Sequence, residues 1–118
     1  MLVDTSYTII DRNNLPYDGD TYEFEGLHYH DTAVSFIWVE MKPGGSVRLH
    51  KHPYTEILII QEGVGEYSVG SELIEAHVGQ IIIVPAETAH KFTNSGDKIP
   101  RQVDIHTSRQ FITDWLEK

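Results

Sequence analysis

The sequence predicts an all-β domain, either a sandwich or a barrel, and three observations support this. Short β-prone runs separated by turn formers recur from Val34 to His106, at the spacing of about eight to twelve residues that is typical of such folds. Several runs are apolar throughout, as from Ile57 to Ile60, which indicates strands covered on both faces. With 118 residues, the chain has the length of one domain.

The chain divides into an irregular arm, a barrel and a final segment, which span residues 1–33, 34–107 and 108–118. In the arm, Tyr7 to Ile10 has the composition of a short strand, and the turn formers between Asp11 and Asp20 predict loops. The strands expected in the barrel are 34–41, 46–50, 56–61, 65–69, 73–77, 80–84, 90–93 and 101–106. Gly70-Ser71 fits the tight two-residue turn of a hairpin.

The final segment, 108–118, is predicted to be a short α-helix. Ser108 is a suitable N-cap, and apolar residues recur at helical spacing from Arg109 to Lys118. These residues are Phe111, Ile112, Trp115 and Leu116. The stripe must pack on an apolar surface, either on its own barrel or across a dimer. A small barrel has one interior, so covering the other face of its apolar strands needs the N-terminal arm, the final helix or a second subunit. We expect a homodimer.

The charge balance excludes several classes of partner. Nine Lys and Arg against eighteen Asp and Glu give a formal charge of -9, which disfavours nucleic acid and anionic membrane surfaces.

There is no cysteine, so neither disulfide bonds nor a thiolate zinc site are available. No apolar run approaches the ~18 residues of a membrane span, and the first residues lack a signal-peptide pattern. We therefore expect a cytoplasmic protein.

The stretch from Gly44 to Gly63 contains the strongest functional signal. His50 and His52 are two residues apart, so their side chains project from the same face of a β-strand. Glu56 follows four residues later, and Pro53 between them predicts a bend that folds the glutamate back toward the two histidines. Two imidazoles and a carboxylate then converge in a geometry that suits one shared metal ion.

A second constellation lies downstream. Gly79 is followed at fixed spacing by Pro85, His90 and Asn94, and together the two stretches resemble the paired motifs of the cupin superfamily, in particular its small single-domain members. The sequence departs from the family pattern at one position, where Glu87 stands in place of a glycine. If that turn needs a positive φ, the substitution costs on the order of 1 kcal/mol.

The resemblance implies a double-stranded β-helix, or jelly-roll barrel, with His50, His52, Glu56 and His90 as metal ligands. Imidazole and carboxylate without thiolate suit Fe, Mn, Ni, Co, Cu or Zn as the divalent ion. Four protein ligands leave two positions of an octahedral metal open, whereas structural zinc sites are closed. We therefore expect a small metalloenzyme of dioxygenase, decarboxylase or isomerase type, acting on a small oxygen-rich molecule. The alternatives are a binding or sensing module and a purely structural metal.

Other residues are weaker candidates for function. His106 ends the last strand, where it either faces the cavity as a proton donor or acceptor or is an ordinary strand-end histidine. Tyr54, between His52 and Glu56, is placed to border the metal, and we take it with His106 as a candidate catalytic residue. His28 and His30 form another His-x-His pair without a following carboxylate, and we interpret them mainly as surface or packing residues, with one near the barrel mouth as the alternative.

Overall fold

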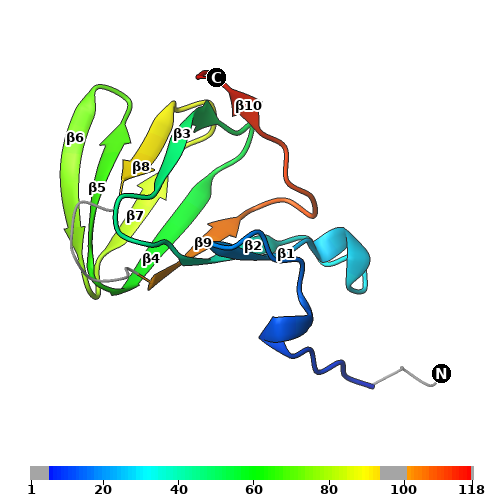
Figure 1. The fold of residues 1–118 in the computed structure, drawn as a ribbon. Helices are drawn as coiled ribbons and strands as arrows, with labels where there is room; N and C mark the ends of the chain where they lie inside the picture. Colours follow the sequence, from blue (N-terminus) through cyan, green and yellow to red (C-terminus); the bar gives the residue numbers. More distant parts are fainter. Residues whose placement is uncertain (1–5, 94–100, 118) are drawn as a thin grey trace.

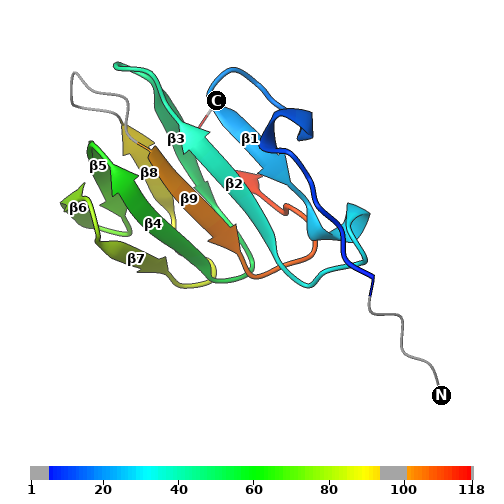
Figure 2. The ribbon, with the colours of Figure 1, turned by 90° about the horizontal axis from the view of Figure 1, so that it is seen from below.

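Two five-stranded antiparallel sheets face each other in the computed structural model, which describes residues 6–93 and 101–117 (Figure 1). The first sheet contains, in spatial order, β1 (Thr21–Phe24), β2 (Ser35–Glu40), β9 (Arg101–His106), β4 (Glu56–Glu62) and β7 (Ile81–Val84). The second contains β10 (Asp114–Trp115), β3 (Ser46–Lys51), β8 (His90–Thr93), β5 (Val64–Val69) and β6 (Glu72–His77). Figure 2 shows the first sheet in the foreground. The predicted all-β jelly-roll architecture is confirmed.

The turns between the strands explain the glycines of the two motifs. Gly44, Gly63 and Gly79 all have positive φ, of 82°, 78° and 86°, which a residue without a Cβ adopts at little cost. Gly70 and Ser71 form the predicted two-residue turn, because Val69 pairs directly with Glu72. Each strand expected between residues 34 and 106 is present, with ends that differ by a residue or two.

The N-terminal arm is more ordered than the sequence indicates. It contains two 3-10 turns, η1 (Arg12–Asn14) and η2 (Gly26–His28), and the strand β1, which pairs with β2. Tyr7 to Ile10, expected as a strand, has no regular secondary structure. Asn94, the last residue of the second motif, lies outside the described residues, as does Lys118. In the described part of the chain, no helix has the length and apolarity needed to cross a bilayer.

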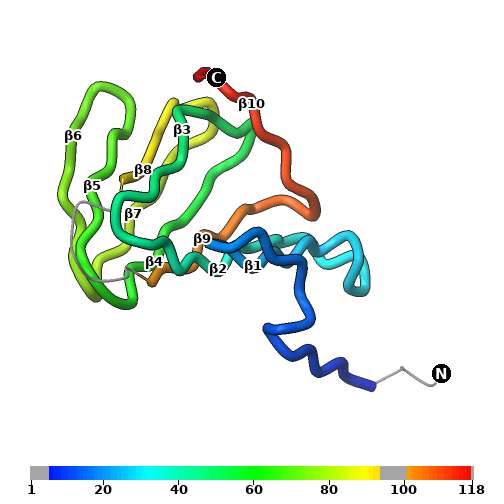
Figure 3. Tube along the Cα trace, viewed as in Figure 1, coloured from blue at the N-terminus to red at the C-terminus, as the bar shows by residue number. Residues whose placement is uncertain are grey.

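The prediction of a C-terminal helix is wrong. After β9 the chain crosses from the first sheet to the second as an extended segment and ends in β10, which pairs with β3 (Figures 1 and 3). Trp115 lies opposite His50 in this pairing, and Leu116 N donates to Leu49 O at 2.9 Å. The backbone of the last residues therefore bonds to β3 rather than to its own preceding turn. Phe111 and Trp115 line the space between the sheets, whereas Ile112 and Leu116 are exposed.

Alternation of side chains separates the core from the outer face. The inward-facing residues form one apolar cluster that includes Val39, Leu58 and Phe92. On the outer face of the first sheet, Ile81 and Ile83 of β7 are 62% and 63% exposed. The prediction that both faces of these strands are covered does not hold for β7 in the single chain.

Candidate metal centre

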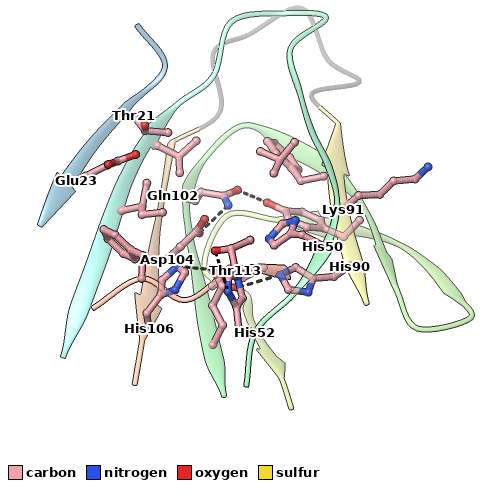
Figure 4. Close-up of a pocket in the computed structure, with 18 of the residues that line it drawn as sticks. Thr21, Glu23, His50, His52, His90, Lys91, Gln102, Asp104, His106 and Thr113 are labelled. Carbon is pink, nitrogen blue, oxygen red and sulfur yellow. Dashed lines mark hydrogen bonds and ion pairs between the residues drawn. The ribbon is translucent and has the colours of Figure 1, made fainter. Parts of the chain in front are cut away.

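Four side chains converge between the sheets. The ligand atoms of His50, His52, Glu56 and His90 all lie within 4.8 Å of one another, and all four residues are buried. Figure 4 labels the three histidines. This is the set that the sequence predicts, and it combines residues of β3, β4, β8 and the turn after β3. The structure therefore brings together residues that are up to forty positions apart in sequence.

The local structure follows from strand geometry and one bend. On β3, His50 points inward and pairs in register with His90 of β8. The chain bends at Pro53 and Tyr54, and Glu56 then opens β4 with its side chain on the inner face. Glu56 is in register with His106 of the neighbouring strand β9. The predicted bend thus delivers the carboxylate to the two histidines.

Backbone carbonyl groups fix the orientation of all three ligand rings. The Nδ1 atoms of His50, His52 and His90 each bond to a carbonyl oxygen, at 2.7, 2.8 and 2.9 Å. The acceptors are Arg48, Ile112 and Thr88. A carbonyl only accepts, so Nδ1 carries the hydrogen and Nε2 is the ligating nitrogen. These three bonds leave the Nε2 atom of each imidazole to face a metal ion.

Unpaired nitrogens test whether the site fits a cation. Among the described residues, Nε2 of His52 and Nε2 of His106 are buried without a hydrogen bond, and that of His52 lies 3.3 Å from Glu56 Oε1. The same oxygen is 3.0 Å from His90 Nε2. A buried polar atom without a partner is costly, and a metal ion between these groups would satisfy it. The donor set of three imidazoles and one carboxylate suits a divalent transition metal.

Electrostatics also favour a cation. Burial lowers the pKa of His50 to about 4, so its imidazole is neutral and available as a ligand at neutral pH. Burial alone would raise the pKa of the Glu56 carboxyl, but the surrounding imidazoles, with His106 foremost, outweigh it and hold the pKa well below its usual range. Glu56 is therefore an anion at the centre of the cluster.

His106 and Tyr54 lie beside the ligands. His106 is buried, and its Nε2 is 3.1 Å from Glu56 Oε2, the oxygen that faces away from His52 and His90. Tyr54 hydroxyl hydrogen-bonds to His106 Nδ1 at 2.6 Å, and its ring stacks on that of His52 with centroids 5.1 Å apart. Burial raises the pKa of Tyr54 to about 12, so its hydroxyl stays protonated. Of the two interpretations of His106, the structure supports the one in which it faces the cavity.

A cavity of about 310 Å³ extends from the four ligands toward β1. Its wall is mostly apolar and includes Leu58, Tyr67, Phe92, Phe111 and Trp115. Two polar residues of β9 also line it, and sequence reasoning missed both (Figure 4). They are Gln102 and Asp104, which share the inward face of β9 with His106 because side chains alternate along a strand. That alternation, counted back from His106, is the signal that would have found them.

The family is decided by a match to known proteins. The cupin-domain family model matches residues 37–106. The chain belongs to the cupin family. As a cupin it carries both histidines, the glutamate and the later histidine of the expected motifs, now seen as one cluster. When bound at these cupin residues, a divalent metal polarises a carbonyl or enolate oxygen or lowers the pKa of bound water.

Individual cupins and related proteins resemble this chain over part of their length. It is 33% identical over 64 residues to "Polyketide synthase CurC" of Streptomyces cyaneus, which covers 53% of this chain and 42% of that protein. A Bacillus subtilis oxalate decarboxylase studied for its Mn(II) centres has a TM-score of 0.78 at 18% identity, covering 88% of this chain and 30% of that one. A formate complex of Lactobacillus farciminis oxalate decarboxylase has a TM-score of 0.78 at 19% identity, and the match covers 88% of this chain and 34% of that one. The chain thus spans less than half of each, and the structural likeness concerns the fold alone.

The departure from the cupin motif at Glu87 has a clear structural consequence. Glu87 adopts a φ of 66°, in the left-handed region that favours glycine. The turn is retained because Glu87 N donates to His52 O at 2.7 Å and the Glu87 carboxylate pairs with Lys51 Nζ at 3.0 Å. The strain expected from the sequence is present, and the cupin ligands are in place despite it.

The remaining histidines and acidic residues lie apart from the ligands of this cupin. His28 pairs with Glu25 at 3.5 Å with its side chain exposed, and His30 Nε2 bonds to Thr8 Oγ1 at 2.6 Å. Both histidines are surface residues, in agreement with the main interpretation from the sequence. Asp18 and Glu23, in contrast, line the far end of the cavity. Burial raises the pKa of Glu23, and the negative charge of Asp18 adds to this.

Proposed function

We propose that this cupin is a metal-dependent enzyme that acts on a small oxygen-rich molecule, by dioxygenase, decarboxylase or isomerase chemistry. One observation carries the proposal: the four ligand side chains form part of the wall of a cavity of about 310 Å³, so a metal held there is reachable by a substrate. Such a volume is at the lower end of the range for small-molecule sites. A purely structural metal needs no such cavity beside it.

The relatives support the reaction class in different ways. Oxalate decarboxylases share the fold, which is compatible with decarboxylation but does not carry over their substrate. The relative that is 33% identical over 64 residues is named a polyketide synthase, and polyketides are rich in carbonyl and hydroxyl oxygens. Both names are consistent with a substrate that offers oxygen atoms to the metal.

We assign proton handling to His106, with Tyr54 acting through it. His106 lines the cavity, and its two ring nitrogens face Glu56 and Tyr54. The adjacent Glu56 carboxylate stabilises the protonated form of His106. Tyr54 holds the ring in place, since Ile112 N donates to the same hydroxyl oxygen at 3.3 Å and fixes it from the other side.

The test begins with metal analysis of protein purified without chelating resin. The protein is then reconstituted separately with Fe(II) and with zinc, and oxygen uptake and product formation are measured with enediols, diketones, catechols and small carboxylic acids. Turnover that His90→Ala abolishes supports the proposal, and oxygen uptake distinguishes a dioxygenase from a decarboxylase or isomerase. Metal binding without turnover of any compound, together with a bound metabolite that stays unaltered, would indicate a binding module instead.

We also propose that the protein is a homodimer. Two rows of apolar residues run across the outer face of the first sheet, through cross-strand partners such as Ile57 with Ile83 and Ile59 with Ile81. On the β1 side, the Arg12 guanidinium packs over Tyr22. The β7 side of the same face is exposed within the described residues. A second copy that covers it would remove apolar surface from water without placing like charges together.

A further inference from the structure

The cavity differs from a site built for a small anion. Four carboxyl groups line it, those of Asp18, Glu23, Glu56 and Asp104. Among the described residues of its lining, Lys91 is the one lysine or arginine, and its ammonium group already lies 3.6 Å from the Glu117 carboxylate. Carboxylate substrates are held most effectively by the paired N–H groups of an arginine, and no arginine is among these residues.

The apolar part of the wall is suited to a ring. Tyr67 and Phe92 stack on each other with centroids 4.7 Å apart on the second sheet, and Phe111 and Trp115 of the final segment contribute two further aromatic faces. Leu58 contributes to the wall from the first sheet. Flat apolar molecules pack on such faces in offset or edge-to-face arrangements.

One polar group interrupts this wall close to the metal ligands. Asp104 lies one inward position before His106 on β9, deep in the protein but with part of its surface accessible from the cavity. Its Oδ1 accepts a hydrogen bond of 2.7 Å from Gln102 Nε2, and the Tyr67 hydroxyl donates in turn to Gln102 Oε1. The two bonds fix the side chains of Gln102 and Asp104. Gln102 bonds to Oδ1 of Asp104, and Asp104 lines the cavity, where a ligand can reach its carboxyl group.

We infer that the cavity binds an uncharged ring compound bearing hydroxyl or carbonyl oxygens, with one oxygen at the metal ligands and a second, a hydroxyl, hydrogen-bonded to Asp104. This inference rests on the proposed function, because it names the substrate class of the same site. A carboxyl group in either protonation state bonds to a hydroxyl, as acceptor or as donor. Asp104 is thus a specificity-determining residue, and Gln102 and Tyr67 are positioning residues that hold it.

The test measures binding, not turnover, on zinc-loaded protein kept under nitrogen. The probe is 1,3-dihydroxynaphthalene, whose two hydroxyls are too far apart to share one metal ion, so the second needs a protein partner. Three compounds are compared with it. Naphthalene-1,3-dicarboxylate has the same ring but carries two negative charges, and oxalate is a small anion. 2-Naphthol has the ring and one hydroxyl but lacks the second. Affinities come from calorimetry, and zinc content is measured for each variant, so loss of the metal is recognised separately.

Wild-type protein is expected to bind the dihydroxy probe about tenfold more tightly than the dicarboxylate, because a buried charge without a partner is costly. Asp104→Leu should weaken the dihydroxy probe about tenfold and leave 2-naphthol nearly unchanged, as loss of one hydrogen bond predicts. Asp104→Asn, which keeps a donor and an acceptor, should restore most of the affinity. Gln102→Leu should produce a smaller loss, again confined to the dihydroxy probe.

Tighter binding of the dicarboxylate or of oxalate would overturn the inference. Equal effects of Asp104→Leu on both naphthols would also overturn it. If Asp104→Leu does not fold, Gln102→Leu replaces it in the test. A Gln102→Leu variant that prefers the dihydroxy probe over 2-naphthol as strongly as the wild type does would then overturn the inference. The two proposals fail separately: probe binding as described without turnover of any compound removes the enzymatic proposal alone, whereas turnover confined to small anions removes the substrate class alone.

Discussion

The ring of His52 donates its Nδ1 hydrogen to the backbone carbonyl of Ile112, at 2.8 Å and across 60 residues of sequence. The final segment therefore orients a metal-ligand residue in addition to closing the space between the sheets. Thr113 adds a side-chain contact to the same nitrogen at 3.3 Å. The metal affinity of the site should consequently depend on a segment that contributes no ligand of its own.

Trp115→Ala tests this dependence. Trp115 anchors β10 beside β3, with its ring 5.0 Å from that of His50 and under the Arg48 guanidinium. Its removal should loosen the Ile112 carbonyl and lower metal affinity by about tenfold, within the ~10–100-fold typical of groups that orient ligands. Competition with a chromophoric chelator measures the affinity. Leu116→Ala, the neighbouring change outside the cavity wall, serves as the control, and equal affinities for both variants would contradict the prediction.

The same segment explains where sequence reasoning succeeded and where it did not. The ligands His50, His52, Glu56 and His90 could be predicted because strand alternation and motif spacing are local properties of the chain. The fate of the final segment could not. Its apolar spacing fits a helix, but the unpaired edge of β3 offered its backbone partners that only the folded molecule reveals.

Asp104 and β1 were missed for related reasons. Asp104 has no motif around it, and its position in the cavity depends on β9 lying between β2 and β4. β1 contains Glu23, and a charged residue considered without its neighbours is expected to be exposed to solvent. In the sheet, however, Glu23 lies opposite Ile37. Both residues are interpreted correctly only once the neighbouring strands are known.

Glu56→Gln should remove metal binding almost entirely. The change keeps the size of the side chain but deletes the negative charge on which the three imidazoles converge. We expect metal affinity to fall by more than about 100-fold, beyond the usual effect of orienting groups, while the far-ultraviolet circular dichroism of the fold is retained. Glu62→Gln, the same substitution at the exposed far end of β4, should bind metal like the wild type. Stoichiometric metal in Glu56→Gln would contradict this role.

The stability of the metal-free protein should depend on Asp104 and pH. Burial raises the pKa of this carboxyl well above its ordinary value of 3.8, and the nearby negative charge of Glu56 adds to the effect. The neutral form is thus favoured by folding, and its contribution to stability is complete below pH 3.8 and is lost as pH rises through the raised pKa. Asp104→Asn, which is never ionised, should therefore melt at a higher temperature than the wild type at neutral pH.

The difference in melting temperature should disappear near pH 4 and grow with rising pH until the folded-state pKa is passed. Thermal melts in the presence of chelator, at intervals from pH 4 to pH 9, give the profile. A constant difference between wild type and Asp104→Asn at all pH values would show that ionisation of Asp104 is not responsible.

Glu87→Gly should relieve the strain of the second-motif turn. Glycine adopts the observed φ of 66° without a Cβ penalty, which favours the variant by about 1 kcal/mol. The substitution also removes the surface ion pair with Lys51, worth about 0–1 kcal/mol. Glu87→Ala loses the same ion pair but keeps the strain. The free energy of unfolding of the glycine variant should therefore be about 1 kcal/mol larger than that of the alanine variant. Urea denaturation of metal-free protein compares the two.

Ile83→Lys tests the dimer. Ile83 is 63% exposed on β7 and pairs with Ile57, which continues the apolar row to Ile105 of β9. If a second copy covers this row, a lysine there places one charge from each subunit in an apolar interface, and the dimer should dissociate. Light scattering coupled to size exclusion measures the mass. Leu73→Lys changes a comparably exposed residue on β6 of the opposite sheet and should remain dimeric. A monomeric wild-type protein would contradict the dimer, and a monomer caused equally by both changes would place the interface elsewhere.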